Sequence, residues 1–211
     1  MPKASDFKKG FTLVELLMVI AILAVLSSAV IVILNPGELL AEGRDAKRIN
    51  ELNTVYAALA VYVSQVPNAD LGGCSAGGIC TFDPGAGKGP FANTTCAAIN
   101  AATNISGTGW VSADFTDILG GSPIASLPID PMNSAIYFYA YMCSESPYVF
   151  ELDTRLESQK YRGEMAFDSG DKNCLCGGMA CTSDNIQNMT VDESTAANCF
   201  YEVGTAVGLS L

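Results

Sequence analysis

Histidine is absent from this sequence, which excludes the commonest arrangements for nucleophilic catalysis. A Ser-His-Asp triad and a Cys-His pair both need an imidazole to accept the proton of the nucleophile. No pair of carboxylates stands out from the generally acidic composition, and we expect the cysteines to be bridged rather than reactive. The sequence therefore predicts that the protein is not an enzyme.

Positive charge is scarce. The chain has 11 lysine and arginine residues against 22 aspartate and glutamate residues, for a formal net charge of −11. From Asp70 onward there are five basic and sixteen acidic residues, so the negative charge belongs to the C-terminal part of the chain. A surface of this kind repels phosphate backbones, and we expect no direct binding of nucleic acid.

Cysteine is absent from the first 73 residues. An even number of cysteines in a glycine-rich domain indicates a disulfide framework in an oxidising compartment, and eight cysteines allow 105 pairings. Zinc is the alternative, because "CLCGGMAC" is dense in thiols, but it contains no paired CxxC spacing and histidine ligands are lacking. The sequence favours disulfides and leaves their pairing open. The candidates are Cys74, Cys80, Cys96, Cys143, Cys174, Cys176, Cys181 and Cys199.

Charge is also missing from the nineteen residues Leu16 to Leu34. Residues 11–34 form a largely apolar stretch, which as a helix would reach about 36 Å. A bilayer core is about 30 Å thick, so this stretch is predicted to span it as a single helix. A secretory signal has a shorter apolar region, of about 7–15 residues, and no small-residue cleavage motif follows Leu34.

Basic residues flank this apolar stretch. Lys3, Lys8 and Lys9 precede it, which favours a cytoplasmic N-terminus and an exported head. It is followed by Arg44, Lys47 and Arg48, which weaken the asymmetry. We expect a single-pass protein of the cytoplasmic membrane.

Glu15 is a lone carboxylate at the start of the apolar stretch, four residues after Phe11. An ionised side chain in hydrocarbon costs a few kcal/mol, so an acidic group there usually has a partner or a function. No partner lies nearby in the chain. The alternative is that Glu15 sits at the level of the lipid headgroups, beside the lysines.

The stretch "KKGFTLVELLMVIAILAVLSS" consists of a short basic leader ending in glycine, then Phe, then Thr-Leu-Val-Glu and an apolar helix. It resembles the N-terminal signature of type IV pilins and of the pseudopilins of type II secretion. The likeness extends to the C-terminal half, where "LPIDP", "YVFELDTRLES", "YRGEMAFDSGD" and "YEVG" follow in the order of a small pilin or major pseudopilin head. Residues 66–110 carry no such likeness.

The resemblance implies how the N-terminus is processed. A membrane aspartyl peptidase of that family cuts after the glycine and methylates the new amine, which here places the cut between Gly10 and Phe11. The amine freed on Phe11 is cationic at neutral pH, because such groups titrate at about 7.7–8.0. By resemblance, Glu15 pairs with the N-terminal amine of a neighbouring subunit in the filament and so specifies register.

The resemblance also implies a function. We expect a prepilin, a structural subunit that is cleaved, N-methylated and polymerised with copies of itself into a type IV pilus-like filament outside the cell. The expected partners are the prepilin peptidase, a membrane assembly platform and a cytoplasmic ATPase. The alternatives are a pseudopilin that forms a short periplasmic filament, and an uncleaved membrane-anchored protein whose head binds a ligand.

The predicted fold is α+β, with a long N-terminal helix packed on a small antiparallel sheet head with long disulfide-pinned loops. Asn35-Pro36-Gly37 should end or kink the helix. Apolar residues then recur at intervals of three and four residues as far as about Ser64, which predicts a second helical segment. The expected division is a leader at 1–10, a transmembrane and filament-core helix at 11–34, an upper stalk helix at 35–64 and a globular pilin-like head at 65–211.

Three strands are expected in the head. Ala135–Met142 and Tyr148–Thr154 are rich in aromatic and β-branched residues and are separated by "CSESP", which predicts an antiparallel hairpin. "CFYEVGTAVGL" is a candidate for the third strand. Residues 66–110 are predicted to form a long connection pinned by disulfides.

A calcium site is one further hypothesis. Asp168, Asp171 and Asn173 place hard oxygen ligands close together in "FDSGDKN". Major pseudopilins bind calcium in a loop at a similar position, although the ligands cannot be matched one by one. Acidic turns without a metal are commoner, so no cofactor is certain.

Overall fold

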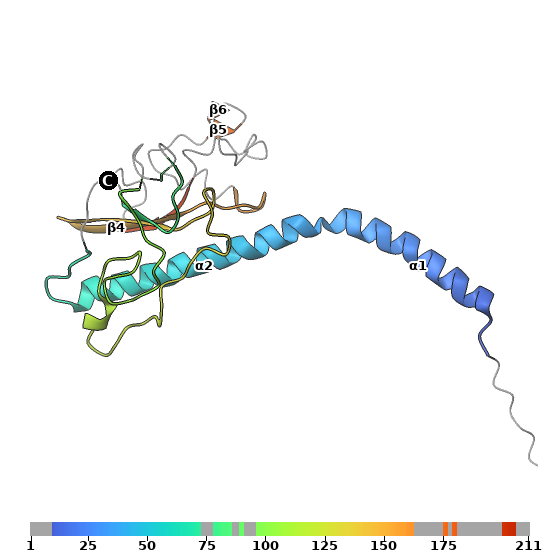
Figure 1. Ribbon diagram of the computed structural model, residues 1–211, viewed down its shortest axis with the longest axis horizontal. Helices are drawn as coiled ribbons and strands as arrows, with labels where there is room; N and C mark the ends of the chain where they lie inside the picture. The colour runs from blue at the N-terminus through green and yellow to red at the C-terminus, as the bar shows by residue number, and fades with distance from the viewer. Residues whose placement is uncertain are drawn as a thin grey trace, which may run out of the picture. The chain divides into compact units, whose positions relative to one another are not determined.

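The computed structural model describes residues 10–72, 78–85, 89–90, 96–162, 175–176, 179–180 and 200–205. The chain divides into two compact units, Met1–Leu40 and Ala41–Leu211. The elements, labelled in Figure 1 where there is room, are α1 (Leu13–Leu34), α2 (Pro36–Gln65), β1 (Ile79–Cys80), β2 (Ala98–Ile99), η1 (Phe115–Asp117), β3 (Ala140–Glu145), β4 (Tyr148–Thr154), β5 (Leu175–Cys176), β6 (Met179–Ala180) and β7 (Tyr201–Gly204).

Helix α1 is built from large apolar residues on every side and has Glu15 in its first turn. It ends at Leu34, where Asn35 takes a left-handed conformation with φ of 39°. Pro36 then opens α2, a position that suits proline because the first turn of a helix leaves its N–H groups unbonded. The predicted end of the helix is therefore observed, whereas the predicted kink near Pro36 stays a prediction.

The sequence also predicted that the apolar stretch 11–34 crosses a membrane. Within the residues that the structure describes, none of the helices has both the length and the apolar character that a membrane crossing requires. The predicted membrane crossing of residues 11–34 stays a prediction.

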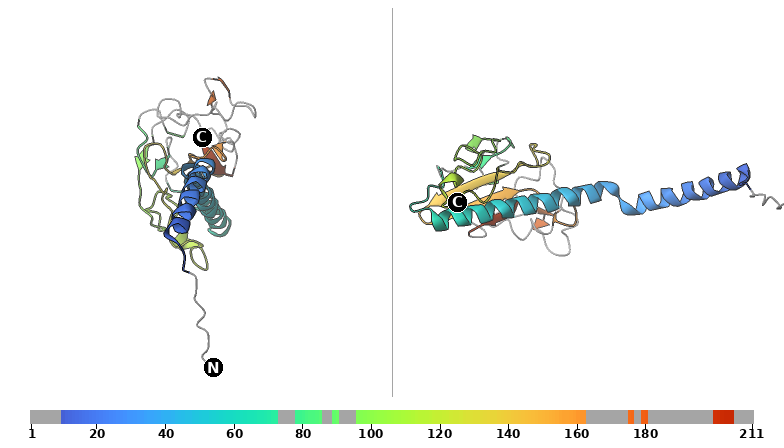
Figure 2. Two further views of the ribbon diagram at one scale, coloured as in Figure 1. Left: turned by 90° about the vertical axis from the view of Figure 1, so that its right-hand side faces the viewer. Right: turned by 90° about the horizontal axis from the view of Figure 1, so that it is seen from below.

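Helix α2 supplies one side of the head's core. Its apolar residues recur at intervals of three and four residues, so they form one stripe along the helix. On this stripe, Leu52, Val55 and Leu59 are fully buried. The stripe packs against aromatic residues of the sheet, including Tyr141 and Phe150. Figures 1 and 2 show α2 running along one face of the sheet, so the predicted α+β fold, a helix with a small sheet, is confirmed.

The main sheet has five strands in the order β2-β1-β3-β4-β7. It is mixed rather than antiparallel as predicted, because β1 and β2 run parallel while the other neighbours are antiparallel. Parallel neighbours need a connection of a dozen or more residues, and the segment from Cys80 to Ala98 provides it. The sequence predicts only a connection over this segment, since two-residue strands leave no periodic pattern.

The predicted hairpin is present, but its first strand is displaced. The structure has β3 at Ala140–Glu145 rather than Ala135–Met142, and only Ser146 and Pro147 separate it from β4. The backbone before β3 bonds elsewhere: the Tyr139 N–H donates to Thr81 Oγ1 (3.0 Å) and the Tyr139 carbonyl accepts from the Thr81 N–H (2.8 Å). These bonds replace the strand ladder that the aromatic run suggested.

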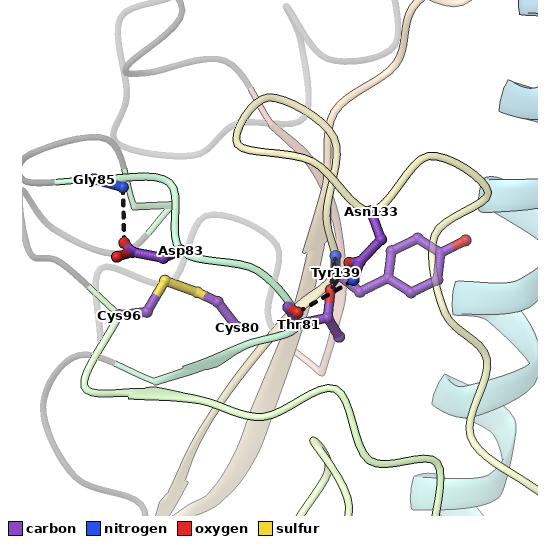
Figure 3. Close-up of a disulfide and its surroundings, with 7 residues drawn as sticks. All are labelled: Cys80, Thr81, Asp83, Gly85, Cys96, Asn133 and Tyr139. Carbon is purple, nitrogen blue, oxygen red and sulfur yellow. Dashed lines mark hydrogen bonds between the residues drawn. A yellow bond between two sulfur atoms is a disulfide. The ribbon is translucent and has the colours of Figure 1, made fainter.

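One disulfide joins two described cysteines, Cys80 and Cys96, which are 16 positions apart in sequence. Figure 3 shows it beside Thr81 and Asn133, with the ring of Tyr139 directed from this cluster toward a helix. Cys143 is also disulfide-bonded. The disulfide prediction is thus borne out at these three positions. The side chains of the other five candidates, Cys74, Cys174, Cys176, Cys181 and Cys199, lie outside what the structure describes.

Candidate functional site

The start of α1 is organised around Thr12 and Glu15. The Glu15 N–H donates to Thr12 Oγ1 (3.2 Å), while the Thr12 N–H and hydroxyl donate to Glu15 Oε2 (3.0 and 2.9 Å). This is a capping box, in which the residue at the N-cap and the residue three positions later satisfy each other's backbone groups. The contact fixes the Glu15 carboxylate at the N-terminal end of the helix, four residues from Phe11.

The peptide bond between Gly10 and Phe11 lies outside this capped turn. Both residues are exposed, Phe11 to 82% of its surface, and no atom lies within 4 Å of the place where a Cβ on Gly10 would stand. Helix α1 begins only at Leu13. The bond therefore lies in exposed backbone before the helix, where a peptidase has access to it.

The carboxylate of Glu15 has capacity for a further donor. Both bonds that reach it from the described residues end on Oε2. An ionised carboxylate offers about four acceptor positions on its two oxygens, so a nearby amine can be accepted while the cap is kept.

A second constellation lies in the head and was not predicted from the sequence. Arg48 on α2 is fully buried and donates to Asp45 Oδ1 (2.8 Å) and, through Nε, to Asp130 Oδ2 (2.6 Å). Burial disfavours the charged guanidinium, but the hydrogen bonds that it donates to Asp130 and Asp45, with the attraction of their negative charges, outweigh that penalty and raise the pKa of Arg48. The guanidinium also lies 4.7 Å from the ring centroid of Tyr137.

The same network holds the segment that follows β4. The backbone N–H groups of Glu157 and Ser158 donate to the Asp45 carboxylate (2.7–3.0 Å). Arg44 forms a two-point contact with the Glu157 carboxylate, and these hydrogen bonds lower the pKa of Glu157, with burial acting in the opposite direction. These contacts attach helix α2 to the loops of the head, so their role is structural.

Three carboxylates gather on the sheet. Asp153 on β4 stands directly opposite Glu202 on β7, and one oxygen from each of these residues and from Glu151 lies within 4.8 Å of the others. Glu151 and Asp153 are buried. Carboxylate oxygens this close are able to hold a hard cation such as Ca²⁺. The sequence showed no sign of the cluster, because it depends on the register between two strands far apart in the chain.

The calcium hypothesis concerned Asp168, Asp171 and Asn173. All three lie outside the described residues. The structure therefore does not test it, and the sheet carboxylates are a separate group of residues.

The first turn of α1 lies inside a segment with a known family signature. A family described as the prokaryotic N-terminal methylation motif matches residues 7–31, which include Gly10, Phe11, Thr12 and Glu15. The chain carries the prepilin-type signature of type IV pilins and pseudopilins. This signature indicates a structural, pilin-like protein, and it implies processing by a prepilin peptidase and assembly into pili.

The comparisons reach no further than this segment. Neither a curated protein nor a solved structure matches the chain. The likeness to known proteins therefore rests on the methylation motif at residues 7–31.

Proposed function

We propose that this protein is a prepilin that is cleaved between Gly10 and Phe11, methylated on the new amine of Phe11 and polymerised through residues 11–34 into a type IV pilus-like filament. The observation that carries the proposal is the prepilin-type signature over residues 7–31, together with an accessible cleavage bond directly before a capped helix.

Glu15 is the proposed assembly residue. Cleavage creates a cationic amine on Phe11, and a single methyl group leaves that charge in place. Among packed apolar helices, an amine and a carboxylate that pair are far more stable than either charge left alone. A neighbouring copy's amine can reach Glu15 without loss of the Thr12 cap, because the capping bonds use one carboxylate oxygen.

The proposal assigns a role to each part of the chain. Residues 1–10 are the leader, 11–34 the segment that is held in the cytoplasmic membrane and then in the filament core, 35–64 the upper stalk and 65–211 the exposed head. Large apolar side chains stand exposed all around α1, from Leu13 to Val30. A helix that is apolar on all sides is stable only when lipid or other helices cover it. An assembly platform and a cytoplasmic ATPase would move the subunit from the membrane into the filament.

Intact-mass measurement of the chain extracted from the cells that make it tests the processing step. The expected mass corresponds to loss of residues 1–10 and gain of one methyl group. A full-length, unmethylated chain would refute the proposal and leave the uncleaved membrane-anchored protein in its place.

The assembly step is tested with Glu15→Gln, which keeps the size and removes the charge. We expect a chain that is cut but yields few or no filaments in electron micrographs. Glu38→Gln is a matched control, because it removes one acidic charge from the first turn of α2 and should leave assembly unchanged. Filaments as abundant in Glu15→Gln as in the parent would contradict the proposed pairing of Glu15 with the Phe11 amine of a neighbouring copy.

A pseudopilin of a secretion apparatus is the second candidate. The prepilin-type signature is shared by both classes. Imaging of the cell surface separates them, because a pilin forms long external fibres whereas a pseudopilin forms a short periplasmic one.

A further inference from the structure

A shallow groove lies on helix α2, in the head. It has a volume of ≈ 410 Å³ and runs between the helix, from Asn50 to Val61, and the loop residues Pro123 and Ile124. Figure 1 shows η1 and the loop that follows it beside the C-terminal part of α2. Ala58 is the buried member of the lining, at 1% exposure.

The groove carries no charge among the residues that the structure describes. Residues 52–69 and 118–129 supply all of its lining except Asn50, and they contain no aspartate, glutamate, lysine or arginine. Two of its polar side chains bond within the helix: Asn53 Nδ2 donates to the Ile49 carbonyl (2.8 Å), and the Thr54 hydroxyl donates to the Asn50 carbonyl (2.8 Å). An apolar side chain that enters the groove therefore leaves these donors bonded.

Leu119, on the loop after η1, is the most exposed large apolar side chain of the described residues, at 89%. It is the second residue of a β-turn in which the Gly121 N–H donates to the Ile118 carbonyl (2.9 Å). Gly120, the third residue, has φ of 108°, which glycine adopts without strain. Ile118 is only 5% exposed and belongs to the core. The turn is thus anchored in the head and presents Leu119 to solvent.

We propose that Leu119 of one copy of the chain enters the α2 groove of a second copy. The inference rests on the proposed function, in which copies polymerise, and it adds a contact between their heads. Leu119 does not fill the groove of its own copy, because it is almost fully exposed. Each copy gives its Leu119 to one neighbour and receives that of another. A contact with this one-way geometry extends a fibre rather than closing into a pair.

The charge of the head selects the occupant. From Asp70 onward the chain has sixteen acidic and five basic residues, so most faces of two heads repel each other. The groove and the Leu119 turn are uncharged, and two copies approach there without that repulsion. The exposed leucine and the uncharged hollow cover each other, as exposed apolar surface tends to be covered in assemblies. A strongly charged partner finds no opposite charge in the groove.

The first test removes the inserted side chain. Leu119→Ser takes away its apolar surface, and Met132→Ser is the matched control, because Met132 is a large apolar side chain on another loop, exposed to 49%. Both variants should be cleaved and methylated by intact mass and should keep the melting temperature of the parent. Electron microscopy gives filament yield. We expect it to fall about tenfold in Leu119→Ser, from the lost burial of one leucine, and to be unchanged in Met132→Ser.

The second test alters the groove. Ala57→Glu places a carboxylate in it, whereas Ala98→Glu adds the same charge at an exposed position on β2, outside the groove. Filaments should be lost in Ala57→Glu and retained in Ala98→Glu. Leu119→Lys by itself should also lose filaments. Combined with Ala57→Glu it should restore them, because the lysine of one copy then meets the glutamate of the next.

Three results would overturn the inference. One is an equal filament yield in Leu119→Ser and Met132→Ser. Another is loss of filaments in Ala57→Glu while Leu119→Ser assembles normally, because the groove would then hold a different occupant. The third is a failure of the combined lysine and glutamate substitutions to restore filaments. A parent chain that is neither processed nor assembled would instead overturn the proposed function, so the two failures are distinguishable.

Discussion

Arg48 and Asp130 lie 82 residues apart in sequence and form a two-point ion pair in the interior of the head. Arg48 Nε donates to Asp130 Oδ2 at 2.6 Å and Nη2 donates to Oδ1 at 3.2 Å, and both side chains are 0% exposed. The pair joins helix α2 to the loop that precedes β3. Because neither charge has access to water, each depends on the other.

We predict that Asp130→Asn destabilises the protein by about 3–5 kcal/mol, because it removes the carboxylate that Arg48 needs in a buried site. Chemical unfolding of the full chain in detergent measures the change. Lys47→Met is the control: Lys47 belongs to an exposed pair with Glu51, and exposed pairs contribute about 0–1 kcal/mol. Similar losses in the two variants would contradict the assignment of Arg48 and Asp130 as the supporting pair.

We predict that the free energy of unfolding decreases in acid because the Glu157 carboxylate becomes protonated. Its hydrogen bonds from Arg44 lower its folded-state pKa, so its contribution is fully present above the unfolded pKa and is lost as the pH falls through the lowered one. The window therefore lies below the ordinary glutamate value of 4.5. The measurement is the free energy of unfolding as a function of pH. In Glu157→Gln this free energy should decrease less steeply at acid pH than in the parent. An unchanged slope in that variant would show that other carboxylates dominate.

The Cys80–Cys96 bridge closes a loop of 16 residues. A bridge of this loop size is worth about 3 kcal/mol, chiefly by restricting the unfolded chain. Cys80→Ser with Cys96→Ser should lower the melting temperature and leave cleavage after Gly10 unchanged in intact mass. Peptide mapping without reductant supplies the check on the parent: a fragment containing Cys80 must be linked to one containing Cys96.

The Thr12 cap should stabilise the first turn of α1. Thr12→Ala removes the hydroxyl that accepts from Glu15, and loss of such a cap costs about 0.5–2 kcal/mol. Hydrogen exchange of the amides in the first turn, measured in detergent, should accelerate. Thr12→Ser keeps the hydroxyl and should exchange at nearly the parent rate. Equal acceleration in both variants would mean that the threonine methyl group, and not the cap, orders this turn.

Patterns that are local in the sequence predicted local structure well. The period of apolar residues indicated the second helix, which the structure has at Pro36–Gln65. The aromatic run indicated a hairpin, although its first strand was placed five residues too early because bonds from Thr81 to Tyr139 hold the preceding backbone. Two-residue strands such as β1 and β2 left no pattern to detect.

The sequence by itself determined the prepilin-type signature, the apolar α1 and the position of Glu15, because each depends on residues only a few positions apart. Only the tertiary structure decided the mixed sheet, the burial of Arg48 against Asp130 and the meeting of Asp153 with Glu202. These depend on strand register and on contacts between distant segments. Such contacts form only when the whole head packs, because each is stabilised by the burial that the others provide.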